Sequence, residues 1–103
     1  MTDLEKRVTE LRAKYEEPIR KYYGAYRTYQ EACVNTPLED YDRIIKLYER
    51  CERLFPIGAT SAAGSAVKHM DKIDSGLEPT DLGKELLISW IERWVTDMEE
   101  VEI

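Results

Sequence analysis

Apolar residues recur at every third or fourth position along almost the whole chain, and this spacing constrains the fold more than any other feature. Such a period places the apolar side chains on one face of an α-helix, whereas a half-buried strand would need strict alternation. The four prolines lie at positions 18, 37, 56 and 79, and proline is a residue that starts, bends or ends helices. The sequence therefore predicts an all-α protein, a small helical bundle that forms one domain over residues 1–103.

The first helix is expected to be long and bent, over residues 3–34. Thr2 and Glu5 form a capping box, in which each side chain satisfies a free amide at the start of the helix. Pro18 interrupts the helical period, because it lacks an amide hydrogen and its ring collides with the carbonyl four residues earlier. We therefore expect a kink near Pro18.

A second helix over residues 37–55 is expected to fold back along the first. Thr36 would be its N-cap and Pro37 its first residue. Such a short connection makes the two helices antiparallel neighbours. Cys33 would then lie beside the turn and Cys51 about 20 Å away along the hairpin, at a rise of ~1.5 Å per residue, too far for a disulfide.

Two further helices complete the predicted bundle. The apolar spacing favours a short helix over residues 61–75, ending at Gly76, and an amphipathic last helix over residues 80–100. Residues 57–66 are rich in glycine, serine and threonine, which have low helix propensity. The sequence leaves open whether this segment is helical or a mobile loop.

The apolar stripe of the first helix extends further than its partner helix can cover. A helix over residues 37–55 spans about 28 Å, at ~1.5 Å per residue, and reaches back only to about Pro18. Either the last helix covers the remaining stripe, or a second copy of the chain does. We favour a homodimer or larger oligomer, and two tryptophans four residues apart are further interface or core candidates. The predicted interface residues are Leu4, Val8, Leu11, Tyr15, Trp90 and Trp94.

The residue counts exclude much chemistry. One histidine and two cysteines cannot supply the four ligands of a structural zinc site, and no glycine-rich phosphate loop occurs. Ser65 and His69 share a helix face, but this pattern is common by chance. We therefore expect no catalytic residue, no metal and no cofactor. Charges recur through the first 30 residues, which argues against a signal peptide or membrane span and favours a cytoplasmic location, the host cytoplasm if the protein is viral.

Two segments are candidates for binding a small anion. Residues 20–29 hold four tyrosines and three cations, and tyrosine stacks on rings while arginine pairs with phosphate. Residues 58–65 hold small and hydroxyl side chains. Packing is the alternative interpretation of both, because their spacing also suits a core. The candidate ligand residues are Arg20, Tyr22, Tyr23, Tyr26, Arg27, Thr60, Ser61 and Ser65.

Charge is concentrated at one end of the chain. The formal charge is −6, and residues 77–103 hold eight acids and two bases, so that the rest is neutral overall. An acidic balance argues against direct nucleic-acid binding. The final acids can form either a solvated helix end or a docking surface for a basic partner. These candidate partner residues are Asp97, Glu99, Glu100 and Glu102.

Two functions from different classes follow from these observations. The first is a non-enzymatic, oligomeric interaction or regulatory protein that binds another macromolecule. Small acidic helical chains of this kind are typical of bacterial or phage inhibitors and adaptors, an analogy at the level of the class. The alternative is a protein that binds or sequesters a nucleotide or another phosphorylated compound.

Overall fold

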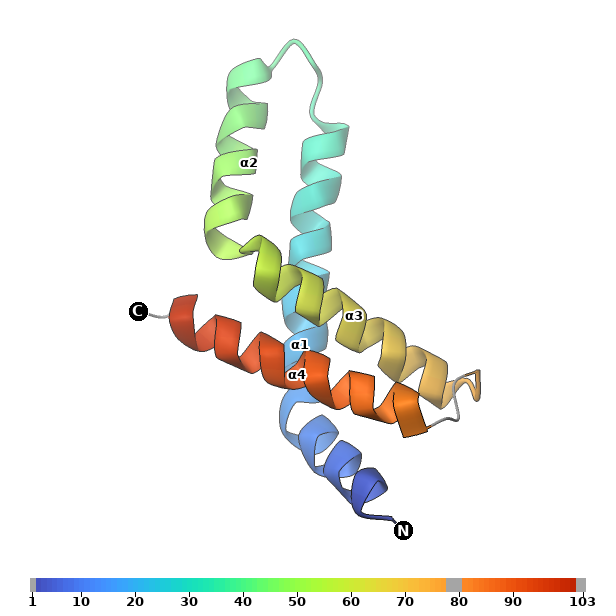
Figure 1. Cartoon of the computed structure of the whole chain (residues 1–103). Helices are drawn as coiled ribbons and strands as arrows, with labels where there is room; N and C mark the ends of the chain where they lie inside the picture. The colour runs from blue at the N-terminus through green and yellow to red at the C-terminus, as the bar shows by residue number, and fades with distance from the viewer. Residues whose placement is uncertain (1, 78–80, 102–103) are drawn as a thin grey trace.

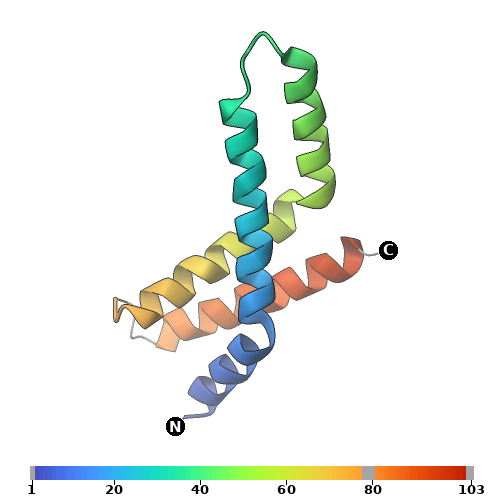
Figure 2. The same ribbon diagram turned by 180° about the vertical axis from the view of Figure 1, so that it is seen from behind.

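The chain folds into helices alone in the part that the computed structural model describes, residues 2–77 and 81–101. α3 and α4 lie side by side, α1 crosses one face of this pair, and α2 folds back along the C-terminal half of α1 (Figures 1 and 2). The expected all-α bundle is thereby confirmed, with α3 and α4 as its most extensively packed pair. The helices span Asp3–Asn35 (α1), Tyr41–Leu54 (α2), Ile57–Asp74 (α3) and Asp81–Val101 (α4).

α1 is one continuous helix that bends without breaking. The hydroxyl of Thr2 accepts a hydrogen bond from the backbone amide of Glu5 at 3.2 Å, so the predicted N-cap is confirmed. Pro18 lies inside the helix, where it removes one backbone hydrogen bond. The ribbon bends in the half of α1 that contains this proline (Figure 2). Because of the bend, the N-terminal part of α1 packs against α3 and α4 while its C-terminal part pairs with α2.

α2 begins at Tyr41, later than the sequence indicates, and the expected start at Pro37 is wrong. Thr36 does not cap α2, because Asp40 stands at the N-cap position of that helix. The hydroxyl of Thr36 donates to the carbonyl of Ala32 at 2.6 Å in the last turn of α1. The amide of Asp40 donates to the carbonyl of Pro37 at 2.9 Å and closes a turn instead. A threonine between two helices can serve either one, and here it serves the first.

α3 begins at Ile57, so the glycine- and serine-rich segment is helical and the predicted start at residue 61 is too late. Pro56 stands at the N-cap position, and its carbonyl accepts the amide of Thr60 at 2.9 Å. Packing overrides weak helix propensity here, since one face of α3 is fully buried. That face consists of Ala59, Ala62, Ala63, Ala66 and Met70.

α3 ends where the sequence predicts. Gly76 has a φ of +73°, a left-handed conformation that glycine adopts without strain. The amides of Gly76 and Leu77 donate to the carbonyls of Ile73 and Lys72 at 3.1 and 2.9 Å, the pattern of a Schellman motif.

The N-terminal stripe of α1 is covered by α4 of the same chain. Val8 and Leu11 are buried in one continuous core with Leu87 and Ile91 of α4. Arg7 bonds to Glu92 across this contact at 3.0 Å. Of the two alternatives that the sequence leaves open, the last helix therefore supplies the cover.

Candidate functional site

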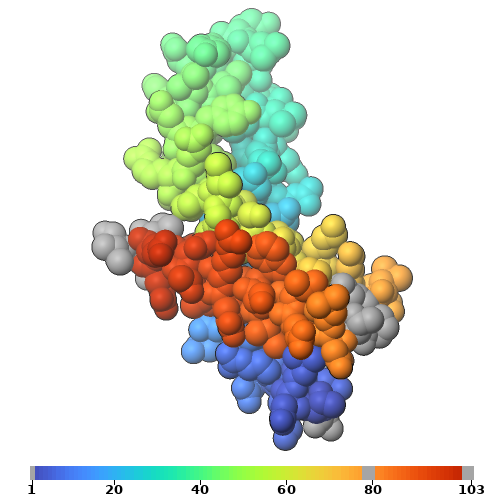
Figure 3. Space-filling model, viewed as in Figure 1, coloured from blue at the N-terminus to red at the C-terminus, as the bar shows by residue number. Residues whose placement is uncertain are grey.

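α2 and the part of α1 that pairs with it project from the body as an arm, here residues 24–55 (Figure 3). None of the residues of α2 is buried. Ile44, Leu47 and Cys51 are half-buried against α1, but Tyr41, Ile45 and Tyr48 are exposed on the adjoining flank. A monomeric surface seldom leaves so much of one helix apolar and uncovered, so this flank is a candidate interaction surface.

An apolar groove of about 490 Å³ lies between the two helices of the arm. Tyr48 and Val34 stand at its margins, 56% and 82% exposed. A groove between two antiparallel helices has the shape that accepts the apolar face of a third helix. The residues that line this arm groove are Tyr26, Arg27, Gln30, Glu31, Cys33, Val34, Asn35, Tyr48, Cys51, Glu52, Phe55 and Ile57.

The two cysteines line the arm groove together, so the expected separation along the hairpin is wrong. Residues 36–40 rise beyond the end of α1 before α2 descends, so the two helices of the arm are staggered (Figure 1). Burial raises the pKa of the Cys51 thiol, and the nearby Cys33 raises it further. Both thiols are free.

A second groove, of about 470 Å³, lies where α1 crosses α3. The hydroxyls of Tyr22 and Thr60 are 3.1 Å apart and join the two helices beneath it. The ring of Tyr23 lies so close to α3 that a Cβ on Gly64 would be 3.0 Å from its Cε2 atom. We call this the crossing groove, and its lining residues are Tyr23, Tyr26, Phe55, Ile57, Thr60, Ser61, Gly64, Ser65 and Lys68.

The crossing groove gathers most of the ligand residues that the sequence singles out. Tyr23, Tyr26, Thr60, Ser61 and Ser65 all line it. This gathering needed α3 to be helical from residue 57, which places one face of its first three turns beside the tyrosines of α1.

The other three ligand candidates lie elsewhere. Tyr22 packs edge-on against Phe55 and Trp94, at ring-centroid distances of 5.2 and 5.8 Å, and burial raises its pKa. Arg27 lines the arm groove, and Arg20 is paired with carboxylates. The packing interpretation therefore describes Tyr22 best.

Lys68 also lines the crossing groove, and it is not among the ligand residues that the sequence predicts. Its position, four residues after Gly64 and three after Ser65, places it on the same helical face. That spacing was a usable signal once residues 57–66 were known to be helical.

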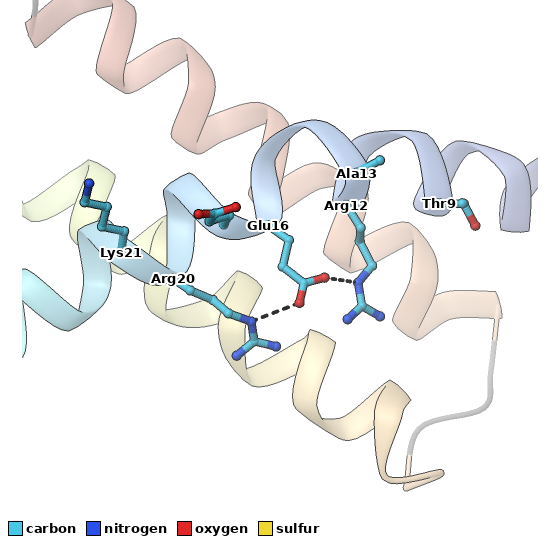
Figure 4. Close-up of a pocket in the computed structure, with 7 residues that line it drawn as sticks. Thr9, Arg12, Ala13, Glu16, Arg20 and Lys21 are labelled. Carbon is cyan, nitrogen blue, oxygen red and sulfur yellow. Dashed lines mark hydrogen bonds and ion pairs between the residues drawn. The ribbon is translucent and has the colours of Figure 1, made fainter.

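A third surface groove, of about 960 Å³, is lined by side chains of an ion-pair network (Figure 4). Glu16 accepts from Arg12 at 2.6 Å and from Arg20 at 3.0 Å. Arg12 also donates to both carboxylate oxygens of Asp74, at 2.8 and 2.9 Å, and Arg20 bonds to Asp71 at 2.9 Å. The network joins α1 to the C-terminal end of α3, so these arginines already have partners.

The predicted partner acids are not equivalent. Asp97 packs against the start of α3, where a Cβ on Gly58 would be 3.2 Å from its carboxylate oxygen. That position suits an anion, because a helix N-terminus carries partial positive charge. Glu99 and Glu100 are exposed, and Glu102 lies outside the described residues. Asp97 therefore has a structural contact that the two exposed glutamates lack.

The predicted interface residues divide in the same way. Val8, Leu11 and Trp94 belong to the core of a single chain. Leu4, Tyr15 and Trp90 are half-buried. Arg93 lies over the ring of Trp90, with its guanidinium carbon 5.7 Å from the ring centroid.

The described residues contain no group of three or more potential metal ligands, and none of the helices among them is long and apolar enough to cross a membrane. Comparisons of the chain with known protein families, with characterised proteins and with solved structures found no match.

Proposed function

We propose that this protein is a non-enzymatic interaction protein that self-associates through its arm and binds a basic macromolecule through the exposed acids of α4. The observation that carries the proposal is the state of α2, a helix of 14 residues of which none is buried. A helix of that length is marginal by itself in water and depends on packing for its stability. The arm supplies such packing on one side of α2 only.

The exposed flank of α2 favours a second copy of the chain as its cover. Tyr48 lines the arm groove and lies on the same exposed flank as Tyr41 and Ile45. A twofold axis would therefore place the flank of each arm in the groove of the other. Two antiparallel hairpins paired in this way form a four-helix bundle. Each large apolar side chain that becomes fully buried contributes about 1.5–3 kcal/mol.

Charge supports the same arrangement. Acidic and basic residues are interspersed along α2, whereas α4 carries mostly acids. Because the arm projects from the body, two acidic molecules can pair there with little repulsion (Figure 3). Glu99 and Glu100 stay exposed at the end of α4, where a basic partner would gain electrostatic attraction.

Sedimentation equilibrium of the intact chain tests the proposal. We expect the mean mass to rise from one chain towards two between about 1 µM and about 1 mM, the range of moderate to weak affinity. Tyr48→Glu should keep the mass at one chain, because it places a charge in the buried interface.

Ala25→Glu is the matched control, since it adds the same charge to an exposed position of the arm that does not line the groove. It should associate like the unmodified chain. A mass of one chain at every concentration, or equal effects of the two variants, would contradict the proposal.

A further inference from the structure

The crossing groove differs from the other two grooves in the charge of its lining. Carboxylates line the arm groove and the ion-pair groove, but none of the described residues that line the crossing groove is acidic. Lys68 supplies a cation there. In a chain of formal charge −6, this is the described groove that is best suited to an anion.

The two walls of the crossing groove offer different chemistry. The wall from α1 is aromatic, with the rings of Tyr23 and Tyr26 inclined at 32° and their centroids 6.1 Å apart. The wall from α3 presents hydroxyls and an ammonium group. An aromatic face accepts a planar ring, while hydroxyls and an ammonium donate hydrogen bonds to an oxyanion.

The donors of the α3 wall are available for a ligand. Thr9, Thr28 and Thr96 each donate to the carbonyl four residues earlier in their helix. The hydroxyls of Ser61 and Ser65 make no such bond, nor any other hydrogen bond within residues 2–77 and 81–101. The ammonium of Lys68 has no ion pair in the same part of the chain.

The base of the groove is fixed by packing. The Tyr22–Thr60 hydrogen bond holds α1 against α3, and Gly64 lets the ring of Tyr23 lie directly on the helix. Glycine inside a helix costs about 0.5–1 kcal/mol of stability relative to alanine. Gly64 therefore lowers the stability of α3 slightly, but it leaves room for the ring of Tyr23 at the base of the groove.

We propose that the crossing groove binds a small planar aromatic compound that carries a phosphate, of the size of a nucleoside monophosphate. The ring would lie against the tyrosine wall, and the phosphate would accept hydrogen bonds from Ser61, Ser65 and Lys68. A volume of about 470 Å³ falls within the ordinary range of small-molecule sites. Tyr26, Phe55 and Ile57 line both this groove and the arm groove, but the proposed phosphate donors Ser61, Ser65 and Lys68 line the crossing groove alone.

Titration calorimetry of the full chain with adenosine monophosphate tests the site. We expect saturable binding that Lys68→Gln weakens about tenfold, the effect of losing one hydrogen bond between charged groups. The double variant Ser61→Ala, Ser65→Ala should weaken binding as well. Lys72→Gln is the matched control, because Lys72 lies one turn further along α3 and does not line the groove.

Adenosine and inorganic phosphate serve as partial probes, and each should bind more weakly than the monophosphate. No heat of binding with the monophosphate would overturn the proposal. Equal weakening by Lys68→Gln and Lys72→Gln would overturn it too, because it would indicate general attraction to a cationic surface. Circular dichroism of each variant establishes that the helices are intact.

Discussion

Arg12 of α1 forms ion pairs with Glu16 of the same helix and with Asp74 of α3. Its hydrogen bonds hold the pKa of Glu16 and that of Asp74 below their ordinary values. A carboxyl with a lowered folded pKa stabilises the native state fully above its ordinary pKa of about 4. That contribution is lost as the pH falls through the lowered value.

Arg12→Gln should therefore lower the free energy of unfolding at pH 7 by roughly 1 kcal/mol, a value limited by solvent exposure of the carboxylates. The difference from the unmodified chain should shrink near pH 3, where the carboxyls begin to take up protons in both proteins. Urea unfolding followed by circular dichroism at the two pH values measures it.

Arg7→Gln is the control for this prediction, because it removes a single ion pair whose two side chains are each 52% exposed. Its effect should be smaller than that of Arg12→Gln at pH 7. An Arg12→Gln difference of the same size at both pH values would contradict the linkage to Glu16 and Asp74.

At the scale of residues, the sequence indicates which side chains are candidates for a site but not which partners they contact. The cluster of tyrosines and hydroxyls was visible, and five of its members line one groove. The sequence left two roles open for Tyr22, ligand stacking and core packing, because both need the same residue type at the same spacing. The sequence likewise does not distinguish Asp97 from the acidic residues that follow it, because only the fold places Gly58 beside its carboxylate.

At the scale of elements, α3 shows why propensity alone misplaced a helix boundary. Its buried face is mostly alanine, and these small side chains let α4 and α1 approach closely. The burial of that face outweighs the weak propensity of the intervening glycine, serine and threonine residues. The expected start of α2 was too early because a threonine between two helices can either cap the helix that follows or bond to the last turn of the helix before it. The sequence does not decide between the two, and Thr36 bonds to the last turn of α1.

The alanine face supplies a test of this packing. Ala66→Leu should lower the free energy of unfolding by about 1–3 kcal/mol, because a fully buried alanine between helices has no room for a larger side chain. Ala13→Leu, at an exposed position of α1, should change it by less than about 0.5 kcal/mol. Thermal or urea unfolding compares the two, and an unchanged stability of Ala66→Leu would mean that α3 is not closely packed there.

At the scale of the whole molecule, the fold divides into a packed body and a projecting arm (Figures 1 and 3). The periodicity predicted the helices and the α1–α2 hairpin, and it identified α4 as one candidate cover for the start of α1. It could not reveal that α1 crosses α3 and α4 on one face, because helix spacing carries no information on crossing geometry. Much of the exposed apolar surface lies on the arm and little of it on the N-terminal stripe of α1.

Hydrogen–deuterium exchange at low and high protein concentration tests most directly whether the arm is the interaction surface. Amides of α2 should exchange quickly in dilute solution, since no residue of this helix is buried, and slow down as concentration rises. Amides of α3, whose buried face is already covered, should exchange at the same rate at both concentrations. Exchange in α2 that is independent of concentration, or protection that appears in α4 instead, would contradict the account.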